Sequence, residues 1–183
     1  MTAVTLPIHT ERLTLRAHQT SDATRLHEVY AQPNVARFLL DEPWSETVAA
    51  EKVAERIPKN DIAGETGALA LVVELDGTLI GDVLLWYTDE SRRCAEIGWV
   101  FDPSFGGVGY ASEAVSAVLE LCFDSYGVHR VAAQMDARNV ASSRLAERVG
   151  MVREAHMRED WWSKGEWTDT LVFGALHRDR QKS

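Results

Sequence analysis

Residues 105–114 read Phe-Gly-Gly-Val-Gly-Tyr-Ala-Ser-Glu-Ala and contain the most informative local pattern of the chain. Three glycines within four residues let the backbone turn sharply and bring its amides close to a ligand. A helical pattern follows directly, and the start of a helix presents unpaired N–H groups and a partial positive charge. The combination predicts that the loop of residues 106–112 forms an anion site suited to a pyrophosphate.

Glycine loops are common, so the alternative is a tight turn without a ligand. A Walker A loop would end in Gly-Lys-Ser/Thr, and this loop contains no such ending. A dinucleotide-binding fingerprint would place a third glycine where Ser112 stands, in an early βα unit rather than past the middle of the chain. On the loop alone, the tight turn and the anion site are equally open.

The segments around the loop predict a mixed α/β fold with the order β-α-α-β-β-β-α-β-α-β-β. Helices are expected to begin near Ser21 and Ser45 and to cover residues 109–126 and 141–149. Asp76-Gly77 is a two-residue hairpin signal between two of the strands. The predicted fold is therefore a seven-stranded mixed sheet flanked by about four helices. Strands are expected over residues 10–16, 69–75, 78–86, 93–101, 131–135, 151–161 and 167–176.

Length and composition favour one globular domain over residues 1–183, with a core over 10–176 and a flexible tail over 177–183. The chain is 45% hydrophobic and 26% charged, and its net charge is −9. An acidic protein is a poor nucleic-acid binder, so we expect no nucleic-acid partner. A net charge of −9 would attract a cationic acceptor, but the favoured explanation of this charge is that it keeps the protein soluble.

Metal and membrane partners are not expected either. The two cysteines, Cys94 and Cys122, form no CxxC pair, and His27-Glu28 lacks a second histidine because Ala31 stands there. The first residues show no basic region followed by an apolar stretch, and no apolar run is long enough to span a bilayer. These features predict a cytoplasmic protein without a metal.

A second motif gives the glycine loop a specific context. Residues 139–142 read Asn-Val-Ala-Ser and open the next helix, and Leu145, Gly150 and Met151 follow at the end of that helix. The GNAT superfamily of N-acetyltransferases has Gln/Arg-x-x-Gly-x-Gly/Ala after its fourth strand and Asn-x-x-Ala/Ser at the start of the next helix. The chain resembles this superfamily at both places, with Gly109 and Ala111 in the first motif.

Within that superfamily the chain resembles the RimJ/RimL type of ribosomal-protein N-terminal acetyltransferase. That branch begins Thr-Glu-Arg-Leu-x-Leu-Arg, as residues 10–16 do, and has Glu-Ile-Gly before the loop, as residues 96–98 do. It also has Gly-Tyr-Ala-Thr/Ser-Glu-Ala, matched by residues 109–114, and Gly-x-Trp-x-Asp, matched by residues 165–169. Each motif alone is weak, but four in the right order are specific, and together they span residues 10–176.

The resemblance implies an acetyl-CoA-dependent transfer of an acetyl group to a primary amine, such as a protein N-terminal α-amine, by direct attack in a ternary complex. It implies acetyl-CoA as the co-substrate, no metal, and a homodimer, because this branch often forms dimers. The residues that it assigns to CoA are Trp99, Val100 and Phe101 through their backbone, Gly107, Val108, Gly109, Tyr110, Ala111 and Ser112 in the loop, and Asn139 and Ser142 on the next helix.

One departure concerns the loop itself. The branch usually carries a basic residue where this chain has Val108, so we expect backbone amides to provide almost the whole grip on the phosphates. Asn139 is assigned to the pantetheine arm, but an ordinary helix N-cap is an equal alternative, and both roles are compatible.

A second departure concerns the protonation of the thiolate leaving group. In the superfamily this task often falls to a tyrosine seven residues after the asparagine, where this chain has Ala146. Ser142 is the candidate in the branch that the chain resembles, either as an acid or as a hydrogen-bond donor to the thiolate. A serine that only caps the first turn of the helix is an equal alternative.

The general base is the least determined role. Glu96 lies on the strand that leads to the glycine loop and is positioned to act through a water molecule. The alternative, slightly favoured from the sequence, is a carboxylate paired with Arg92 or Arg93. Among the tryptophans, Trp86, Trp161 and Trp162 are the candidates for contact with the acceptor, although most tryptophans pack in cores.

Three other functions stay open at this point. The first is acetylation of a small-molecule amine in place of a protein N-terminus. A catalytically silent acyl-CoA-binding module is compatible with the missing tyrosine at Ala146 and the altered loop. A Rossmann-type nucleotide binder is poorly supported because the loop lacks its fingerprint.

Overall fold

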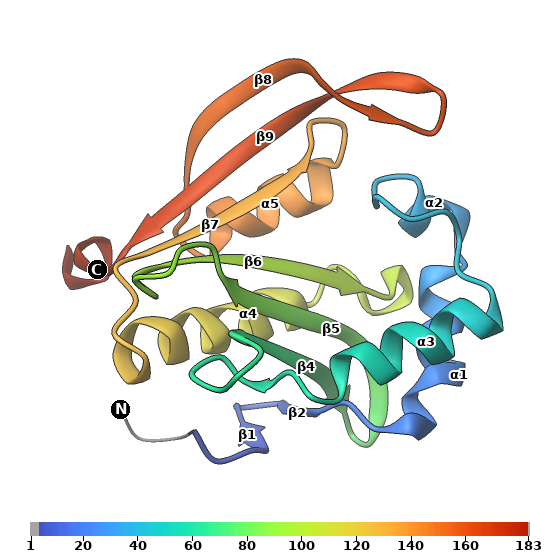
Figure 1. The fold of residues 1–183 in the computed structure, drawn as a ribbon, viewed down its shortest axis with the longest axis horizontal. Coiled ribbons are helices and arrows are strands. Elements are labelled where there is room, and N and C mark those ends of the chain that lie inside the picture. Colours follow the sequence, from blue (N-terminus) through green and yellow to red (C-terminus); the bar gives the residue numbers. More distant parts are fainter. Residues whose placement is uncertain (1–3, 183) are drawn as a thin grey trace.

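A nine-stranded mixed sheet organises residues 4–182, which are the residues that the computed structural model describes (Figure 1). Its strand order is β1-β2-β4-β5-β6-β7-β9-β8, and β3 pairs with β4. All neighbouring strands are antiparallel except β6 and β7. The strands are β1 (Ile8–His9), β2 (Leu13–Ala17), β3 (Asn60–Asp61), β4 (Ala68–Leu75), β5 (Thr78–Tyr87), β6 (Cys94–Phe101), β7 (Arg130–Asp136), β8 (Val152–Ser163) and β9 (Glu166–Leu176).

Two groups of helices cover the sheet. In Figure 1, α1–α3 gather on the right, whereas α4 runs along the sheet. The α-helices are α1 (Ala23–Tyr30), α2 (Pro33–Ala36), α3 (Glu46–Arg56), α4 (Tyr110–Glu120) and α5 (Val140–Arg148). Short 3₁₀ turns are η1 (Thr20–Asp22), η2 (Pro103–Phe105) and η4 (His177–Lys182), and η3 (Leu121–Ser125) is a π-helical turn that continues α4.

The sheet separates two hydrophobic clusters because alternate residues of a strand point to opposite faces. Leu71 and Val73 of β4 pack in the larger cluster, with α4 and α5. Val72 of the same strand packs in the smaller cluster, with Leu26 of α1 and Val53 of α3. Each group of helices therefore has its own core on its own face.

The sheet opens between its two parallel strands. β6 pairs with β7 only over Cys94, Ala95 and Glu96, whereas its pairing with β5 continues to Phe101. Residues 97–101 of β6 consequently have a backbone edge without a strand partner on the β7 side. This opening lies directly before the glycine loop.

The sequence prediction of a mixed α/β sheet with helices on it is confirmed, and the seven long strands are all present. The structure adds three short elements to those predicted: β1, α2 and β3. Residues 177–182 form η4, where we expect a flexible tail, and that flexibility stays a prediction.

Candidate active site

The glycine loop has the backbone conformation that the sequence predicts. Gly107 has a φ of 83° and Gly109 a φ of 89°, values that residues with a side chain rarely adopt. Gly109 is the N-cap of α4, and no side chain caps this helix start. The first amides of α4 therefore point out of the helix without an intrahelical acceptor, as an anion site requires.

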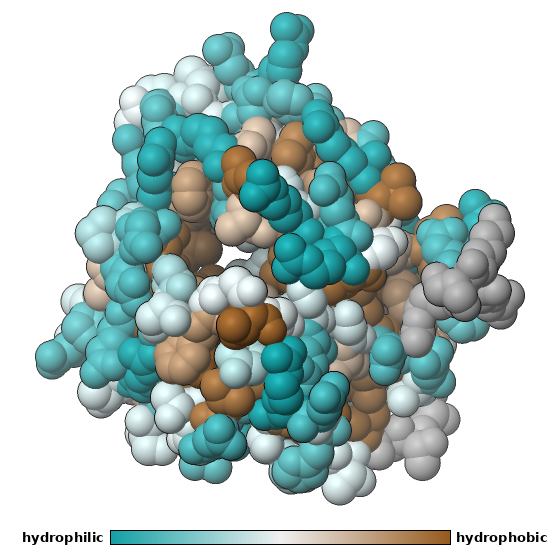
Figure 2. Space-filling view, turned by 180° about the vertical axis from the view of Figure 1, so that it is seen from behind, coloured by the Kyte–Doolittle hydropathy of each residue, from teal (hydrophilic) through white to brown (hydrophobic). Residues whose placement is uncertain are grey.

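A cleft of about 490 Å³ runs from this loop between α2, β6 and α5. Seen from behind in Figure 2, hydrophobic side chains are recessed between hydrophilic ones on this face. Ten of the eleven residues that the sequence assigned to CoA line the cleft: Trp99, Val100, Phe101, Gly107, Gly109, Tyr110, Ala111, Ser112, Asn139 and Ser142. Val108 does not line it, and its side chain is 55% exposed.

The cleft follows the unpaired edge of β6. Trp99, Val100 and Phe101 lie on this edge, in the part of β6 that pairs with β5 on its other side. An extended chain of amides can pair with such an edge as an added strand would. The geometry is suited to a long, amide-containing ligand arm that leads away from the glycine loop.

Asn139 and Ser142 meet at the start of α5. The side-chain oxygen of Asn139 accepts a hydrogen bond from the backbone amide of Ser142 at 3.1 Å, so Asn139 is the N-cap of this helix and also lines the cleft. The indole Nε1–H of Trp99 donates to the Ser142 hydroxyl oxygen at 3.3 Å. Ser142 lines the cleft, and the Trp99 hydrogen bond uses its oxygen as acceptor and does not engage its proton.

Two cationic residues of the cleft were missed from the sequence. Arg144 and Arg148 line it from α5 and lie four residues apart, on the same side of that helix. Arg148 Nη1 lies 3.4 Å from the Ser112 hydroxyl oxygen, at the first turn of α4. The expectation that backbone amides provide almost the whole grip on the phosphates stays a prediction, and the guanidinium groups of Arg144 and Arg148 line the same cleft as the loop.

Glu96 stands where β6 and β7 begin to separate. Its carboxylate accepts a hydrogen bond from the Gln134 side chain at 3.2 Å, and no ion pair joins it to Arg92 or Arg93 in the described part of the chain. Burial raises the pKa of Glu96, and the Gln134 hydrogen bond only partly offsets this. The predicted arginine pairing is thus not found, and the hydrogen-bond partner of this partly buried carboxylate is the neutral side chain of Gln134.

The three tryptophans assigned to the acceptor lie outside the cleft. Trp86 is half-buried on β5, with its ring against Gly98, and its backbone pairs with Glu96. Trp161 and Trp162 are 48% and 58% exposed on β8. Their contact with an acceptor stays a prediction.

A bulge in β8 determines where the hairpin tip lies. Glu159 adopts a φ of 47° at a register shift between Met157 and Trp161, and its amide donates to Asp169 at 2.9 Å. Beyond the bulge, Lys164 at the tip donates to the backbone carbonyls of Ala36 and Leu39, next to α2. The hairpin therefore reaches the segment that forms one wall of the cleft, as Figure 1 shows at its upper right.

Residues 4–182 contain neither a cluster of metal-ligating side chains nor a helix that could span a membrane. No three His, Cys, Asp or Glu side chains come together as metal ligands. No helix has the length and apolar character needed to cross a membrane.

Comparison with known proteins gives these features a family context. Residues 12–152 match the model of the acetyltransferase (GNAT) domain. An uncharacterized N-acetyltransferase, p20, from Bacillus licheniformis is 27% identical over 94% of this chain and 97% of its own length. A putative ribosomal N-acetyltransferase, YdaF, from Bacillus subtilis is 29% identical over 92% and 93%, and the spermidine N(1)-acetyltransferase of Vibrio cholerae is 24% identical over 86% and 89%.

Solved structures agree with the fold. A GNAT-family acetyltransferase from Bacillus anthracis superimposes with a TM-score of 0.84 at 27% identity, over 94% of this chain and 99% of its own. The RimL ribosomal L7/L12 α-N-protein acetyltransferase, solved in complex with coenzyme A, superimposes with a TM-score of 0.80 at 21% identity, over 91% and 95%.

Proposed function

The chain belongs to the GNAT acetyltransferase family and is an N-acetyltransferase that uses acetyl-CoA, and from this premise we propose that its acceptor is the α-amine of a protein or peptide N-terminus. The observation that carries the proposal is the cleft that joins the glycine loop, the free edge of β6 and Ser142 in one continuous surface. The loop and the β6 edge are assigned to the first task of the reaction and Ser142 to the second. Glu96, which is assigned to the third task, is not among the residues that line the cleft.

The first task is to hold the co-substrate. The start of α4 would bind the pyrophosphate through its free amides and partial positive charge, and Arg144 and Arg148 would add charge from α5. The pantetheine arm would run along the β6 edge, where strand-like hydrogen bonds are available. This arrangement would bring the thioester toward Ser142.

The second task is to stabilise the leaving thiolate. A serine hydroxyl is too weak an acid to be fully deprotonated near neutral pH, so the role that suits Ser142 is hydrogen-bond donation to the developing negative charge. Trp99 supports this role because its indole N–H occupies an acceptor position of the hydroxyl and so directs the hydroxyl proton elsewhere. Trp99 is accordingly proposed as a positioning residue.

The third task is to remove a proton from the ammonium of the acceptor. Glu96 would accept it through a water, and its raised pKa brings the carboxylate closer to the working range of a base at neutral pH. Deprotonation at pH 7 costs about 1 kcal/mol for an α-amine and about 4–5 kcal/mol for a lysine. A site with one partly buried carboxylate is better matched to the α-amine.

A polyamine is the second candidate acceptor. The net charge of −9 favours a cationic substrate, and one relative is a spermidine acetyltransferase. A polyamine presents primary amines of high pKa, which require a stronger base than the site offers. The N-terminal α-amine therefore remains the first choice.

A mass-resolved screen with acetyl-CoA tests the proposal. Peptides with free N-termini, the same peptides with blocked N-termini but free lysines, and spermidine are incubated with the enzyme, and both thiol release and product mass are recorded. We expect acetylation of free N-termini only. Acetylation of spermidine alone would move the acceptor to polyamines, and tight CoA binding without thiol release from any amine would favour a silent module.

A further inference from the structure

Arg12 joins the first strand region to the glycine loop, 96 residues further along the chain. Its Nη1 donates to the backbone carbonyl of Val108 at 3.0 Å, and its guanidinium lies 4.6 Å from the ring centroid of Tyr110. A side chain at Gly109 would begin 3.5 Å from Arg12 Nη2. One guanidinium thus contacts Val108 and Tyr110 and leaves little room for a side chain at Gly109 between them, in the loop that would hold the pyrophosphate.

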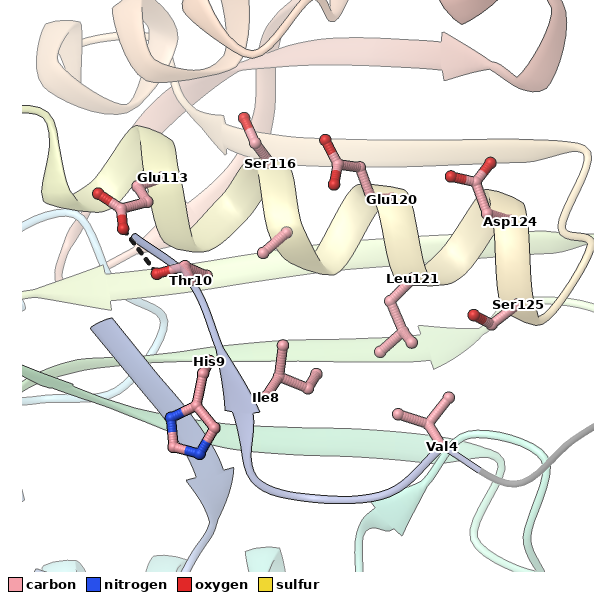
Figure 3. A pocket seen from close by; sticks show the side chains of 11 residues that line it. Val4, Ile8, His9, Thr10, Glu113, Ser116, Glu120, Leu121, Asp124 and Ser125 are labelled. Atoms are coloured by element: carbon pink, nitrogen blue, oxygen red, sulfur yellow. Dashed lines mark hydrogen bonds between the residues drawn. The ribbon is translucent and has the colours of Figure 1, made fainter. Parts of the chain in front are cut away.

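Glu113 in the first turns of α4 fixes Arg12 in this place. Its Oε2 accepts from Arg12 Nε at 2.7 Å, and its Oε1 accepts from the Arg12 amide at 2.8 Å. The Thr10 hydroxyl donates to the same Oε1 at 2.6 Å, a contact visible in Figure 3 at the end of a hollow between α4 and the N-terminal segment. Three donors therefore converge on one carboxylate.

The charge of Glu113 makes this arrangement more than a structural support. Burial acts to raise its pKa, but the hydrogen bonds from Thr10 and Arg12 outweigh burial, so the pKa lies below its ordinary value and the carboxylate stays ionised. A negative charge in the first turns of α4 opposes the binding of an anion at the start of the same helix. The guanidinium of Arg12 cancels that charge and holds the loop backbone at the same time.

We propose that Arg12 is a positioning residue for CoA binding: it fixes the glycine loop through Val108 and Tyr110 and neutralises Glu113 beside the pyrophosphate site. This inference rests on the proposed binding of CoA by that loop. The contacts also connect two of the motifs in the sequence. Thr10 and Arg12 belong to the motif of residues 10–16, and they contact Tyr110 and Glu113 of the motif of residues 109–114. The two motifs form one contact cluster in the folded chain.

The test compares CoA binding by isothermal titration in wild type, Arg12→Ala and the double variant Arg12→Ala/Glu113→Gln. Loss of the charge-assisted hydrogen bonds should weaken CoA binding about tenfold in Arg12→Ala. The Glu113 carboxylate keeps its hydrogen bonds from Thr10 and from the amide of residue 12 in Arg12→Ala, but its charge is no longer neutralised. Removing this charge should restore about threefold of the loss in the double variant, because the repulsion disappears while the Val108 contact stays broken. Arg130→Ala is the matched control, since Arg130 makes a similar bidentate pair with Glu154 away from the cleft.

Pantetheine, which lacks the phosphates, is the second probe and is followed by ligand-observed NMR. Its binding should be equal in wild type and Arg12→Ala, whereas general damage to the fold would weaken both probes. Unchanged CoA binding in a folded Arg12→Ala protein would overturn the inference, and a double variant as weak as Arg12→Ala would overturn its electrostatic part. A wild-type protein that binds no CoA would instead contradict the proposed function.

Discussion

The two walls of the cleft are attached to the sheet in different ways. α4 and α5, on the side of the glycine loop, share one large hydrophobic cluster with most of the strands. α1 and α3 share a smaller cluster and surround buried polar groups: Asp82 of β5 receives hydrogen bonds from Tyr30 and Arg56, and His18 Nε2 lies 3.6 Å from it. The described residues of α1–α3 that line the cleft belong to α2, and α2 in turn contacts α1. We refer to α4 and α5 with the glycine loop as the cofactor wall, and to α2 together with α1 and α3 as the acceptor wall.

The difference matches what each wall has to do. Under the proposed function, the cofactor wall would bind one fixed ligand, and apolar packing together with the contacts of Arg12 holds the loop backbone beside it. The acceptor wall, which the tip of the β8–β9 hairpin contacts, would have to admit an amine and release a product. The acceptor wall is held by the buried polar contacts around Asp82 and by two hydrogen bonds from Lys164. Single substitutions can remove these contacts one at a time.

Asp82→Asn should produce the largest effect, because it leaves the Arg56 guanidinium buried without its counter-charge. We expect the free energy of unfolding to fall by about 4 kcal/mol, as measured by urea denaturation. Glu154→Gln, which weakens an exposed pair with Arg130, is the control and should cost less than about 1 kcal/mol. Equal losses in both variants would remove the distinction between the walls.

Acid should loosen the acceptor wall through His18. Burial is the largest influence on this residue and lowers its pKa from 6.5 to about 4, so the folded protein needs the neutral ring. The neutral ring makes its full contribution to the free energy of unfolding above pH 6.5. This contribution decreases as the pH falls from 6.5 toward 4, because His18 has the higher pKa in the unfolded chain, which therefore binds the proton first. The loss is about 3 kcal/mol for the whole interval.

Urea denaturation between pH 7 and pH 4 measures this loss. His18→Leu, which cannot titrate, should show a flatter pH dependence than wild type over that interval. Identical pH dependence in the two proteins would assign acid sensitivity to other groups.

Gly109→Glu should abolish most CoA binding while the protein stays folded. The substitution forces a side chain into a backbone with a φ of 89° and adds a negative charge at the pyrophosphate site, so we expect about 100-fold weaker binding. Gly77→Glu is the control, since Gly77 has a similar φ of 78° with open space around it in the β4–β5 turn. Unchanged CoA binding in a folded Gly109→Glu protein would disprove the role of the loop.

Lys164→Ala should have the smallest effect and should act on the acceptor alone. Its hydrogen bonds to Ala36 and Leu39 connect the hairpin tip to α2, so their loss should raise the KM for the acceptor about threefold without changing the Kd for CoA. Lys52→Ala, which removes an exposed contact with Asp41, serves as the control. A change in CoA affinity of the same size would mean that the two walls are not independent.

Sequence patterns predicted the elements with a clear period. Helix α3 begins after Ser45, whose hydroxyl caps Val48, and the Asp76-Gly77 turn joins β4 and β5 as expected. Strands of two residues such as β1, and the single turn α2, are too short to show a period, so they were missed.

The candidate site was predictable where one local motif carried it and not where distant segments meet. The sharp turn before α4 was predicted from its three glycines, and the Asn139 cap was one of the two compatible roles that the sequence left open. Arg144 and Arg148 resemble a solvated helix face in the sequence, and the contact of Arg12 with Glu113 joins residues 101 positions apart. The bulge at Glu159 depends on Asp169, so no local pattern shows where the hairpin tip lies.

The central claim is that the glycine loop and the free edge of β6 hold CoA. Hydrogen exchange measured by mass spectrometry, with and without CoA, tests it most directly. With CoA bound, we expect slower exchange at the amides of residues 107–112 and along residues 97–101. The amides of α2 and of the hairpin tip should change little until an acceptor is added. Protection confined to α2 and the hairpin, with none in residues 107–112, would contradict the claim.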